Sequence, residues 1–384
     1  MKRNIYLMYA IGFLQGMVFY GPVATLYRQA QGVTVFQITL IESISLILCI
    51  LLEVIWGVIA DKIGYKKTMV FCCILYFLSK IVFWQASDFA GFLAERIMLS
   101  IVIAGLSGVD TSILYLSCKG KDSQKIFGIY NSLQTAGLLT ASAVFSLFVR
   151  DDYPLSGLLT VISYGIAAVL SLSLTEVRIE ESGQNNAGQF REVLFQTVCN
   201  GKLLLFLTAA AFWSETHQTI TVFLNQLQYE RCGLGNAAIG FIYIMVTIIG
   251  MCGVCSAWFT EKTGIKAAGI ILGGTAAASC IVLAVSETAL PSVCGIAALR
   301  ISNSLFQPFQ MEMQNRQIHT KYRATALSIH AMILDSIAAG TNLVFGVLAE
   351  KDLVTAFLFG VGICIVGMIL LMKWYVLLDF SSIR

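Results

Sequence analysis

Long hydrophobic runs alternate with short polar breaks along nearly the whole chain. A helix needs about 20 apolar residues to cross the hydrocarbon core of a bilayer, and most of these runs reach that length. The runs fall near residues 5–26, 37–60, 68–86, 89–113, 126–149 and 155–176, and again near 202–225, 236–259, 267–286, 289–312, 325–348 and 353–377. The pattern predicts an all-α membrane protein with twelve transmembrane helices.

One polar segment divides these runs into two sets of six. Residues 178–196 read RIEESGQNNAGQFREVLFQ, the longest hydrophilic stretch of the chain. Such a stretch between periodic segments is typical of a linker. We therefore expect an N-terminal six-helix bundle at 1–177, a cytoplasmic linker at 178–200 and a C-terminal six-helix bundle at 201–384.

A short motif occurs once in each set. Residues 57–66 read GVIADKIGYK, and residues 257–266, 200 positions later, read AWFTEKTGIK. The shift places Glu261 on Asp61, Lys262 on Lys62, Gly264 on Gly64 and Lys266 on Lys66. Each copy falls between the second and third helix of its half, which indicates a duplicated unit. Parallel halves of this kind are related by an axis along the membrane normal, so the two bundles should be pseudo-symmetric.

Composition and charge agree with a membrane protein. Hydrophobic residues make up 57% of the 384 residues and charged residues 12%, against about 25% charged in soluble domains. Most lysines and arginines fall on the side of the predicted helices that carries the termini, so both termini should be cytoplasmic in the cell membrane. The first run should remain as a helix and not be cleaved as a signal peptide.

Charge and cysteine spacing exclude several other kinds of partner. The net charge of +3 is too small to indicate nucleic-acid binding, and the 11 cysteines are scattered. The single Cys-x-x-Cys, at Cys252 and Cys255, has no second pair, so we expect neither a metal nor a cofactor. The three histidines form no cluster that would suit a polytopic membrane enzyme.

The loop motif carries a family resemblance. Gly57, Asp61, Lys62, Gly64, Lys66 and Lys67, with Glu53 four residues earlier, resemble the signature loop of the major facilitator superfamily. GLSGVDTSILY at 105–115 resembles the end of the fourth helix of that family, and RATALSIHAMILDS at 323–336 the start of the eleventh. The resemblance implies a twelve-helix secondary transporter, in which this loop stabilises the outward-open state against the eleventh helix.

The spacing of the motif has a physical meaning of its own. Glu53, Gly57 and Asp61 share one helix face, and Gly64 suits a turn with positive φ. The motif would act as a latch that forms in one conformation and opens in the other. The second copy (Glu261, Lys262, Gly264, Lys266) is weaker because Ala257 replaces the glycine. The alternative is a basic loop that sets topology only.

Polar residues within spans are costly in lipid and tend to face a cavity or one another. The tenth helix carries the clearest set, at helical spacing: Arg300, Asn303, Gln307, Gln310 and Gln314. The resemblance places the first, fourth, seventh and tenth helices around a central cavity. Candidate substrate-binding residues are therefore Gln15, Tyr20, Arg96, Trp213, Glu215, Gln218, Arg300, Asn303 and Gln307. The alternative for the polar set is hydrogen bonding between helices.

Intramembrane carboxylates are candidates for proton coupling, because a change of solvation shifts their protonation. The candidates are Glu95, Glu215 and Asp335, and an Asp335–Arg300 pair is one arrangement of the last. For each, a static ion pair is the alternative. Glu42 and Lys80 are expected near the interface or extending toward it.

The sequence thus predicts a secondary transporter that moves a small organic molecule by alternating access. Its partners would be the substrate, the bilayer and a coupling ion, with the proton favoured, and we expect a monomer and no enzymatic activity. Export is slightly favoured, although the fifth helix lacks the proline of the exporter motif. Uptake of a metabolite by a symporter, and a receptor that binds without transport, stay open.

Overall fold

A computed structural model describes residues 2–106, 109–118, 123–177, 194–195, 197–317 and 323–377 of the chain. Every element in these ranges is a helix, which confirms the predicted all-α fold. The described residues form two compact units. Unit 1 comprises Met1–Gly183 and Gly235–Ile244, and unit 2 comprises Gln184–Leu234 and Met245–Arg384. The domain limits drawn from the sequence stay a prediction.

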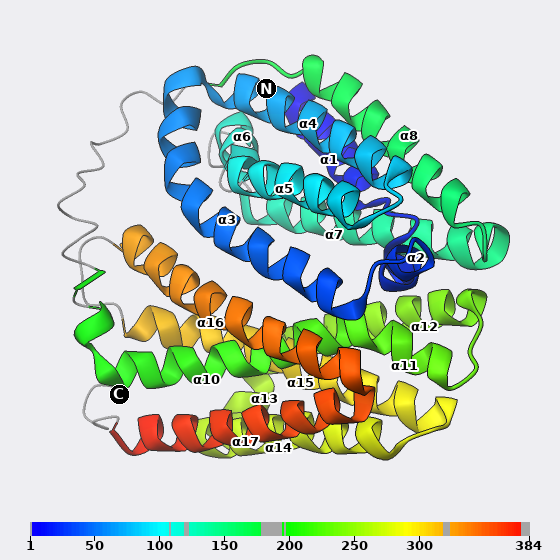
Figure 1. Cartoon of the computed structure of the whole chain (residues 1–384). Coiled ribbons are helices and arrows are strands. Elements are labelled where there is room, and N and C mark those ends of the chain that lie inside the picture. Colours follow the sequence, from blue (N-terminus) through cyan, green and yellow to red (C-terminus); the bar gives the residue numbers. More distant parts are fainter. Residues whose placement is uncertain are drawn as a thin grey trace. The chain divides into compact units, whose positions relative to one another are not determined.

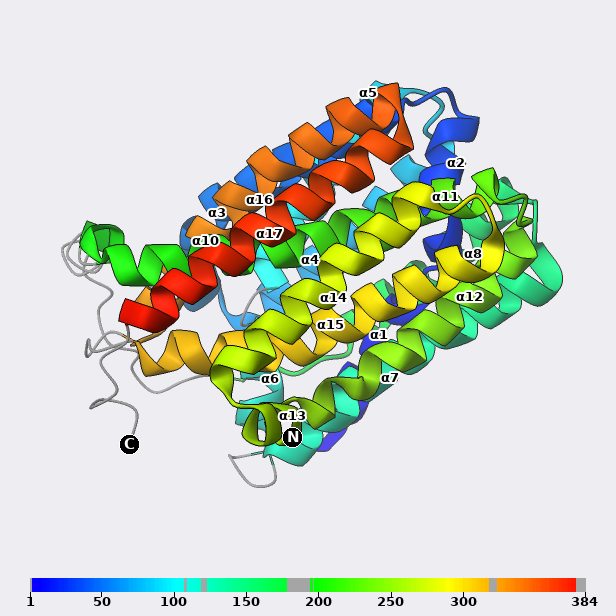
Figure 2. The ribbon, with the colours of Figure 1, turned by 90° about the horizontal axis from the view of Figure 1, so that it is seen from below.

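Unit 1 is built around its first helix. Its elements are α1 (Lys2–Gly16), η1 (Gly21–Val23), α2 (Ala24–Ala30), α3 (Val35–Ile63), α4 (Tyr65–Gln85), α5 (Phe89–Leu106), α6 (Val109–Cys118), α7 (Ser123–Val144), η2 (Phe145–Val149), α8 (Tyr153–Leu172) and the first part of α12 (Asn236–Ile249). Helix α1 packs against α6, α7 and α8 (Figure 2), and α4 packs against α5, α6 and α8. Met8, Met69, Ile113 and Leu114 form a buried core among these helices.

Unit 2 repeats this packing. Its elements are α10 (Gly201–Gln218), η3 (Thr219–Leu224), α11 (Asn225–Arg231), the rest of α12, η4 (Gly250–Cys255), α13 (Ser256–Thr263), α14 (Ile265–Val285), α15 (Ala289–Arg316), α16 (Arg323–Lys351) and α17 (Leu353–Leu377). Helix α10 packs against α16 and α17, and α14 packs against α15 and α17. Figure 1 shows α14 and α17 side by side.

The starts of corresponding helices differ by a constant offset. Helices α4 and α14 begin at Tyr65 and Ile265, and α8 and α17 begin at Tyr153 and Leu353. The offset of 200 residues found in the loop motif therefore extends through most of each unit. The same helices pair within each unit, as a duplicated six-helix unit requires.

Eleven of the described helical stretches are long and apolar enough to cross a membrane. The expected span at 202–225 is helical but is not among them, so the count of twelve stays a prediction. Large hydrophobic side chains such as Phe148 (78% exposed) and Val254 (89% exposed) lie on the surface. Apolar surfaces of this kind require lipid contact. The chain is a multi-pass membrane protein.

Candidate functional site

Unit 1 contains a cavity of about 620 Å³. Its lining comprises Gln15, Gly16, Val18, Tyr76, Ile103, Leu106, Asp110, Tyr130, Gln134, Thr135, Leu138 and Tyr164, from α1, α4, α5, α6, α7 and α8. Two amides, three phenols, one aliphatic hydroxyl and one carboxylate lie among apolar side chains. This mixture suits a ligand that offers both apolar surface and hydrogen-bonding groups.

The end of α1 beside the cavity is held by hydroxyl groups of α8. Helix α1 ends at Gly16, so the following backbone groups lack helical partners. The backbone N–H of Phe19 donates to Thr160 Oγ1 at 3.0 Å, and Ser163 Oγ donates to the Leu14 carbonyl at 2.6 Å. The Tyr164 hydroxyl donates to the Gln15 carbonyl. Backbone groups at membrane depth need such partners, and these bonds fix the position of Gln15.

Behind the cavity wall lies a buried ion pair. Lys80 Nζ on α4 donates to Glu95 Oε1 on α5 at 3.0 Å, and the two side chains are 5% and 1% exposed. The ammonium group also lies 5.2 Å from the ring centre of Tyr76, 5.6 Å from that of Tyr164 and 5.9 Å from that of Tyr20. Cation–π contacts of this length stabilise a desolvated cation. Lys80 therefore does not extend toward solvent, because its partners lie inside the unit.

A second, partly buried ion pair lies one residue further along α5. Arg96 donates to Glu42 on α3, so neither side chain is free for a ligand in this conformation. Arg28, which is 7% exposed, lies 5.5 Å from the Phe83 ring centre and 5.9 Å from that of Phe92. Arg96, which the sequence predicts as a substrate contact, forms this ion pair with Glu42 in the structure. Its role in binding stays a prediction.

In unit 2 the predicted residues Trp213, Glu215 and Arg300 are buried or half-buried. Arg300 Nη1 on α15 lies 3.4 Å from His217 Nε2 on α10. The guanidinium group rests on the backbone of Gly250, where an added Cβ would lie only 2.4 Å from Nε. Trp213 Nε1 donates to the Cys364 carbonyl at 3.1 Å, so its indole N–H holds α10 against α17.

The carboxylate of Glu215 lies in a buried polar group of unit 2. Thr219 Oγ1 is 2.7 Å from Glu215 Oε1 and 3.2 Å from Oδ1 of Asn342 on α16. Asn303 is buried on α15, whereas Gln218 and Gln307 are exposed. Asp335 is half-buried on α16. Along the predicted stripe on α15, Asn303 and Gln314 are therefore buried, Arg300 and Gln310 are half-buried, and Gln307 is exposed.

The predicted gating motif covers the C-terminal part of α3, the turn at Gly64 and the first residues of α4. Gly64 has a φ of 101° and Gly264 a φ of 81°, the range that glycine adopts readily and other residues do not. The backbone N–H of Lys66 donates to Glu176 Oε1 at 3.1 Å, so a carboxylate caps the N-terminus of α4. The backbone of Glu53, Gly57, Asp61 and Lys62 lies in α3, but their side chains lie outside the described residues.

The remaining members of the motif lie on the surface. Lys67, Glu261, Lys262 and Lys266 are exposed. Lys262 Nζ lies 5.0 Å from the ring centre of Trp258, one helical turn earlier. Within the described ranges, no three His, Cys, Asp or Glu side chains gather in a way that could hold a metal ion.

Sequence reasoning placed Gln15 in the site but assigned no role to Asp110, Tyr76, Tyr130 or Gln134, which also line the cavity. Tyr130, Gln134 and Leu138 follow each other at four-residue spacing, so they share one face of α7. This spacing is the signal that could have identified them. Asp110 lies in the stretch that carries the family resemblance, at the first turn of α6.

Comparison with known proteins identifies the fold. The sequence matches the profile of the Major Facilitator Superfamily over residues 5–341. No curated protein sequence matches it. Solved structures with the same fold include the nucleoside transporter NupG, in a point-mutant form (TM-score 0.83, 17% identity, 97% of this chain and 100% of that chain). Others are a bacterial homologue of the human lysosomal transporter Spinster (0.78, 13%, 99% and 97%) and a D-xylose–proton symporter (0.75, 13%, 98% and 97%).

Proposed function

This chain belongs to the major facilitator superfamily, and we propose that it moves a small polar organic molecule across the cell membrane by alternating access, coupled to protons. The family and the membrane location make it a transporter and not an enzyme. The substrate, the coupling ion and the direction are the parts that we propose.

The cavity of unit 1 is the observation that carries the proposal. Gln15, Gln134 and Thr135 offer donors and acceptors, and the half-buried Tyr76 offers an aromatic ring with a hydroxyl group. A ligand with ring surface and several hydroxyl or amide groups would match this lining. From unit 2 we propose that Arg300, Asn303, Gln307, Glu215, Gln218 and Trp213 bind substrate as the sequence predicts. From unit 1 we propose Tyr20, and Arg96 in a conformation that releases it from Glu42.

Asp110 is our leading candidate for proton coupling. Its carboxylate lines the cavity, so its solvation would change when the cavity opens to one side or the other. Glu95 differs, because Lys80 holds it in a buried pair. Glu215 and Asp335 from unit 2 remain candidates, and the same experiment compares them with Asp110.

The test uses purified protein in proteoliposomes and a panel of polar metabolites. A proton gradient should drive accumulation of the substrate, whereas exchange of labelled for unlabelled substrate needs no gradient. Asp110→Asn should abolish gradient-driven accumulation and keep exchange. Glu215→Gln and Asp335→Asn are the matched carboxylate variants. If Asp110→Asn accumulates substrate as the unchanged protein does, the coupling residue lies elsewhere.

The direction follows from transport measured in intact cells. Export, which the sequence slightly favours, would appear as proton-driven loss of substrate from cells, and uptake as accumulation. Binding without flux under every imposed gradient would instead support the receptor alternative. We further propose a monomer with both termini in the cytoplasm, as the distribution of basic residues predicts.

We also propose that the loop from Glu53 to Lys67 acts as the latch of the transport cycle. The positive φ of Gly64 and the carboxylate cap at Lys66 support a fixed turn at this point. A fixed turn would hold the end of α3, which carries Asp61 and Lys62, in one position, as a latch requires. The loop that carries Glu261 and Lys262 in unit 2 would act as its weaker counterpart.

A further inference from the structure

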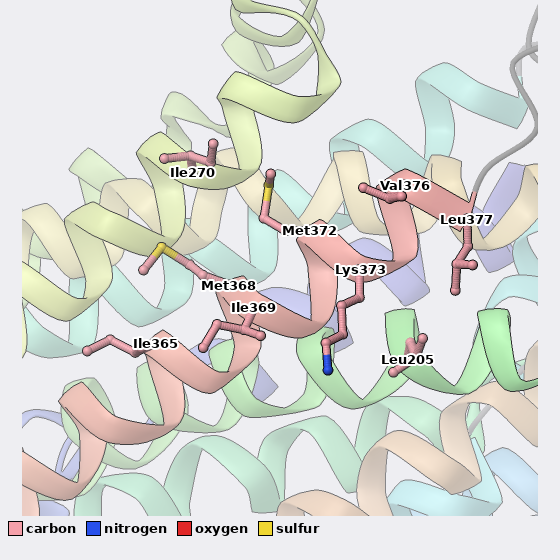
Figure 3. Close-up of a pocket in the computed structure, with 9 residues that line it drawn as sticks. All are labelled: Leu205, Ile270, Ile365, Met368, Ile369, Met372, Lys373, Val376 and Leu377. Carbon is pink, nitrogen blue, oxygen red and sulfur yellow. The ribbon is translucent and has the colours of Figure 1, made fainter.

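The outer surface of unit 2 carries an apolar groove of about 730 Å³ between α10, α14 and α17 (Figure 3). Its lining comprises Leu205, Ile270, Ile365, Met368, Ile369, Met372, Lys373, Val376 and Leu377. All of these except Lys373 are aliphatic or methionine side chains, and several are strongly exposed, including Val376 at 74% and Ile369 at 50%. In a membrane protein such a groove faces lipid.

Three lysines, one from each helix, lie at one end of the groove. Lys202 is the second residue of α10, three positions before Leu205, and Lys266 is the second residue of α14, four positions before Ile270. These spacings place each lysine on the groove side of its helix, one turn from the lining. Lys373 lies in the lining itself, and Figure 3 shows its side chain extending on the side of Leu205.

The three lysines carry uncompensated charge within the described residues. Lys202, Lys266 and Lys373 are exposed, and none forms an ion pair there. Lys266 Nζ lies 5.9 Å from the ring centre of Tyr375 on the last turns of α17, so it reaches the same end of the groove. Three cations beside an apolar channel complement a molecule with an anionic head and an acyl chain.

The corresponding end of unit 1 has a carboxylate that this end of the groove lacks. There the carboxylate of Glu176 caps the N-terminus of α4, and a Cβ on Gly64 would lie 2.9 Å from it. The position 200 residues later is Val376, which lines the groove, and no described atom lies within 4 Å of a Cβ built on Gly264. Val376 has no carboxylate that could accept a hydrogen bond from the first turn of α14, and Gly264 itself supplies no side-chain cap. The N-terminus of a helix favours a nearby anion.

We propose that this groove is a binding site for an anionic phospholipid. One acyl chain lies along Ile365, Ile369 and Met372, and the phosphate lies among Lys202, Lys266 and Lys373 near the start of α14. The site needs only the membrane location of the protein, and it is independent of the proposed substrate and coupling ion. Occupancy of this site on unit 2 would then depend on the amount of anionic phospholipid in one leaflet.

Native mass spectrometry of the purified protein tests the proposal, with phosphatidylglycerol and phosphatidylcholine of identical acyl chains as probes. The unchanged protein should retain phosphatidylglycerol more tightly than phosphatidylcholine. Each of Lys202→Gln, Lys266→Gln and Lys373→Gln should weaken phosphatidylglycerol binding roughly fivefold, the factor for about 1 kcal/mol per basic residue. Phosphatidylcholine binding should not change.

Two controls separate this site from a general attraction to the bilayer. Lys351→Gln removes an exposed lysine at the end of α16, and it should leave the preference for phosphatidylglycerol intact. Met372→Trp fills the groove and keeps all three lysines, so it should lower phosphatidylglycerol binding. Glycerol phosphate, which lacks acyl chains, should not displace the lipid. Equal retention of both lipids, lysine variants that bind as the unchanged protein does, or displacement by glycerol phosphate would each overturn the proposal.

Discussion

Replacing Glu95 with glutamine should destabilise the protein strongly, because the change leaves the Lys80 ammonium group buried without its counter-ion. The two groups lie 3.0 Å apart, and their side chains are 5% and 1% exposed. Glutamine keeps the size and one oxygen of glutamate but removes its charge. The variant therefore tests the charge of the pair and not its packing.

The expected size of the effect follows from the geometry. Two unit charges 3.0 Å apart attract each other with roughly 5 kcal/mol at an effective dielectric constant of about 20. Breaking a buried pair from one side costs about 3–5 kcal/mol, because the remaining charge is uncompensated. The rings of Tyr20, Tyr76 and Tyr164 stay in place around the ammonium group. We therefore expect the lower end, about 3 kcal/mol.

Thermal unfolding of the purified protein in detergent measures the loss. For a domain of this size, about 3 kcal/mol corresponds to a decrease in Tm of roughly 6–12 °C. The double variant Lys80→Met, Glu95→Gln should recover most of the loss, since it removes the buried charge as well. A double-mutant cycle then gives the coupling between the two residues. If Glu95→Gln melts with the unchanged protein, or if the double variant is as unstable as the sum of the single variants, the pair does not stabilise the fold as argued.

Three further changes test the site and the loops. Gly250→Ala should lower substrate affinity roughly tenfold, or about 1.4 kcal/mol, because the new Cβ would lie 2.4 Å from Nε of Arg300 and displace its side chain; a binding titration measures this. Asp61→Asn should reduce the turnover of vesicle transport and leave equilibrium binding nearly unchanged, because the proposed latch acts on the conformational change. Gly64→Ala and Gly264→Ala should each cost about 1–3 kcal/mol, because positive φ with extended ψ is essentially restricted to glycine. Gly64→Ala should lower Tm more because its Cβ also meets a carboxylate.

Each of these has a matched control or a contrary outcome. Gly274→Ala, at a site with nothing within 4 Å, should leave affinity unchanged, so a loss there would point to a general effect of alanine. Unchanged turnover in Asp61→Asn would remove the latch role. Equal melting of the Gly64 and Gly264 variants would show that the contact with Glu176 adds nothing to the strain.

The fold could be predicted from the sequence because a chain segment that crosses lipid must satisfy its backbone hydrogen bonds internally, as a helix does. Hydrophobic runs of spanning length predict helices, and every expected run from 5–26 to 353–377 is largely helical where the structure describes it. The turn at Gly64 was equally readable, because few residues other than glycine tolerate its φ of 101°. The motif at 257–266 also predicts the offset of 200 residues between corresponding helices of the two units.

The site was harder to predict because its partners come from different helices. The sequence placed Lys80 and Glu42 near the interface, and only the packing of α4 on α5 and of α3 on α5 shows that each forms an ion pair with a residue of α5. The sequence around Asp110 does not distinguish a carboxylate that lines a cavity from one that stabilises the N-terminus of its helix. Polar spacing on α15 identified Arg300, but its contact with His217 depends on the approach of α10.

The constant offset between the units constrains how helices could be exchanged between them. The residues 200 positions after Lys80 and Glu95 are Cys280 and Gly295, so unit 2 has neither member of the pair. A chimera that carried α4 into unit 2 without α5 would strand an ammonium group in a neutral interior. Recombination would therefore have to transfer helices α4 and α5 together to keep the Lys80–Glu95 pair.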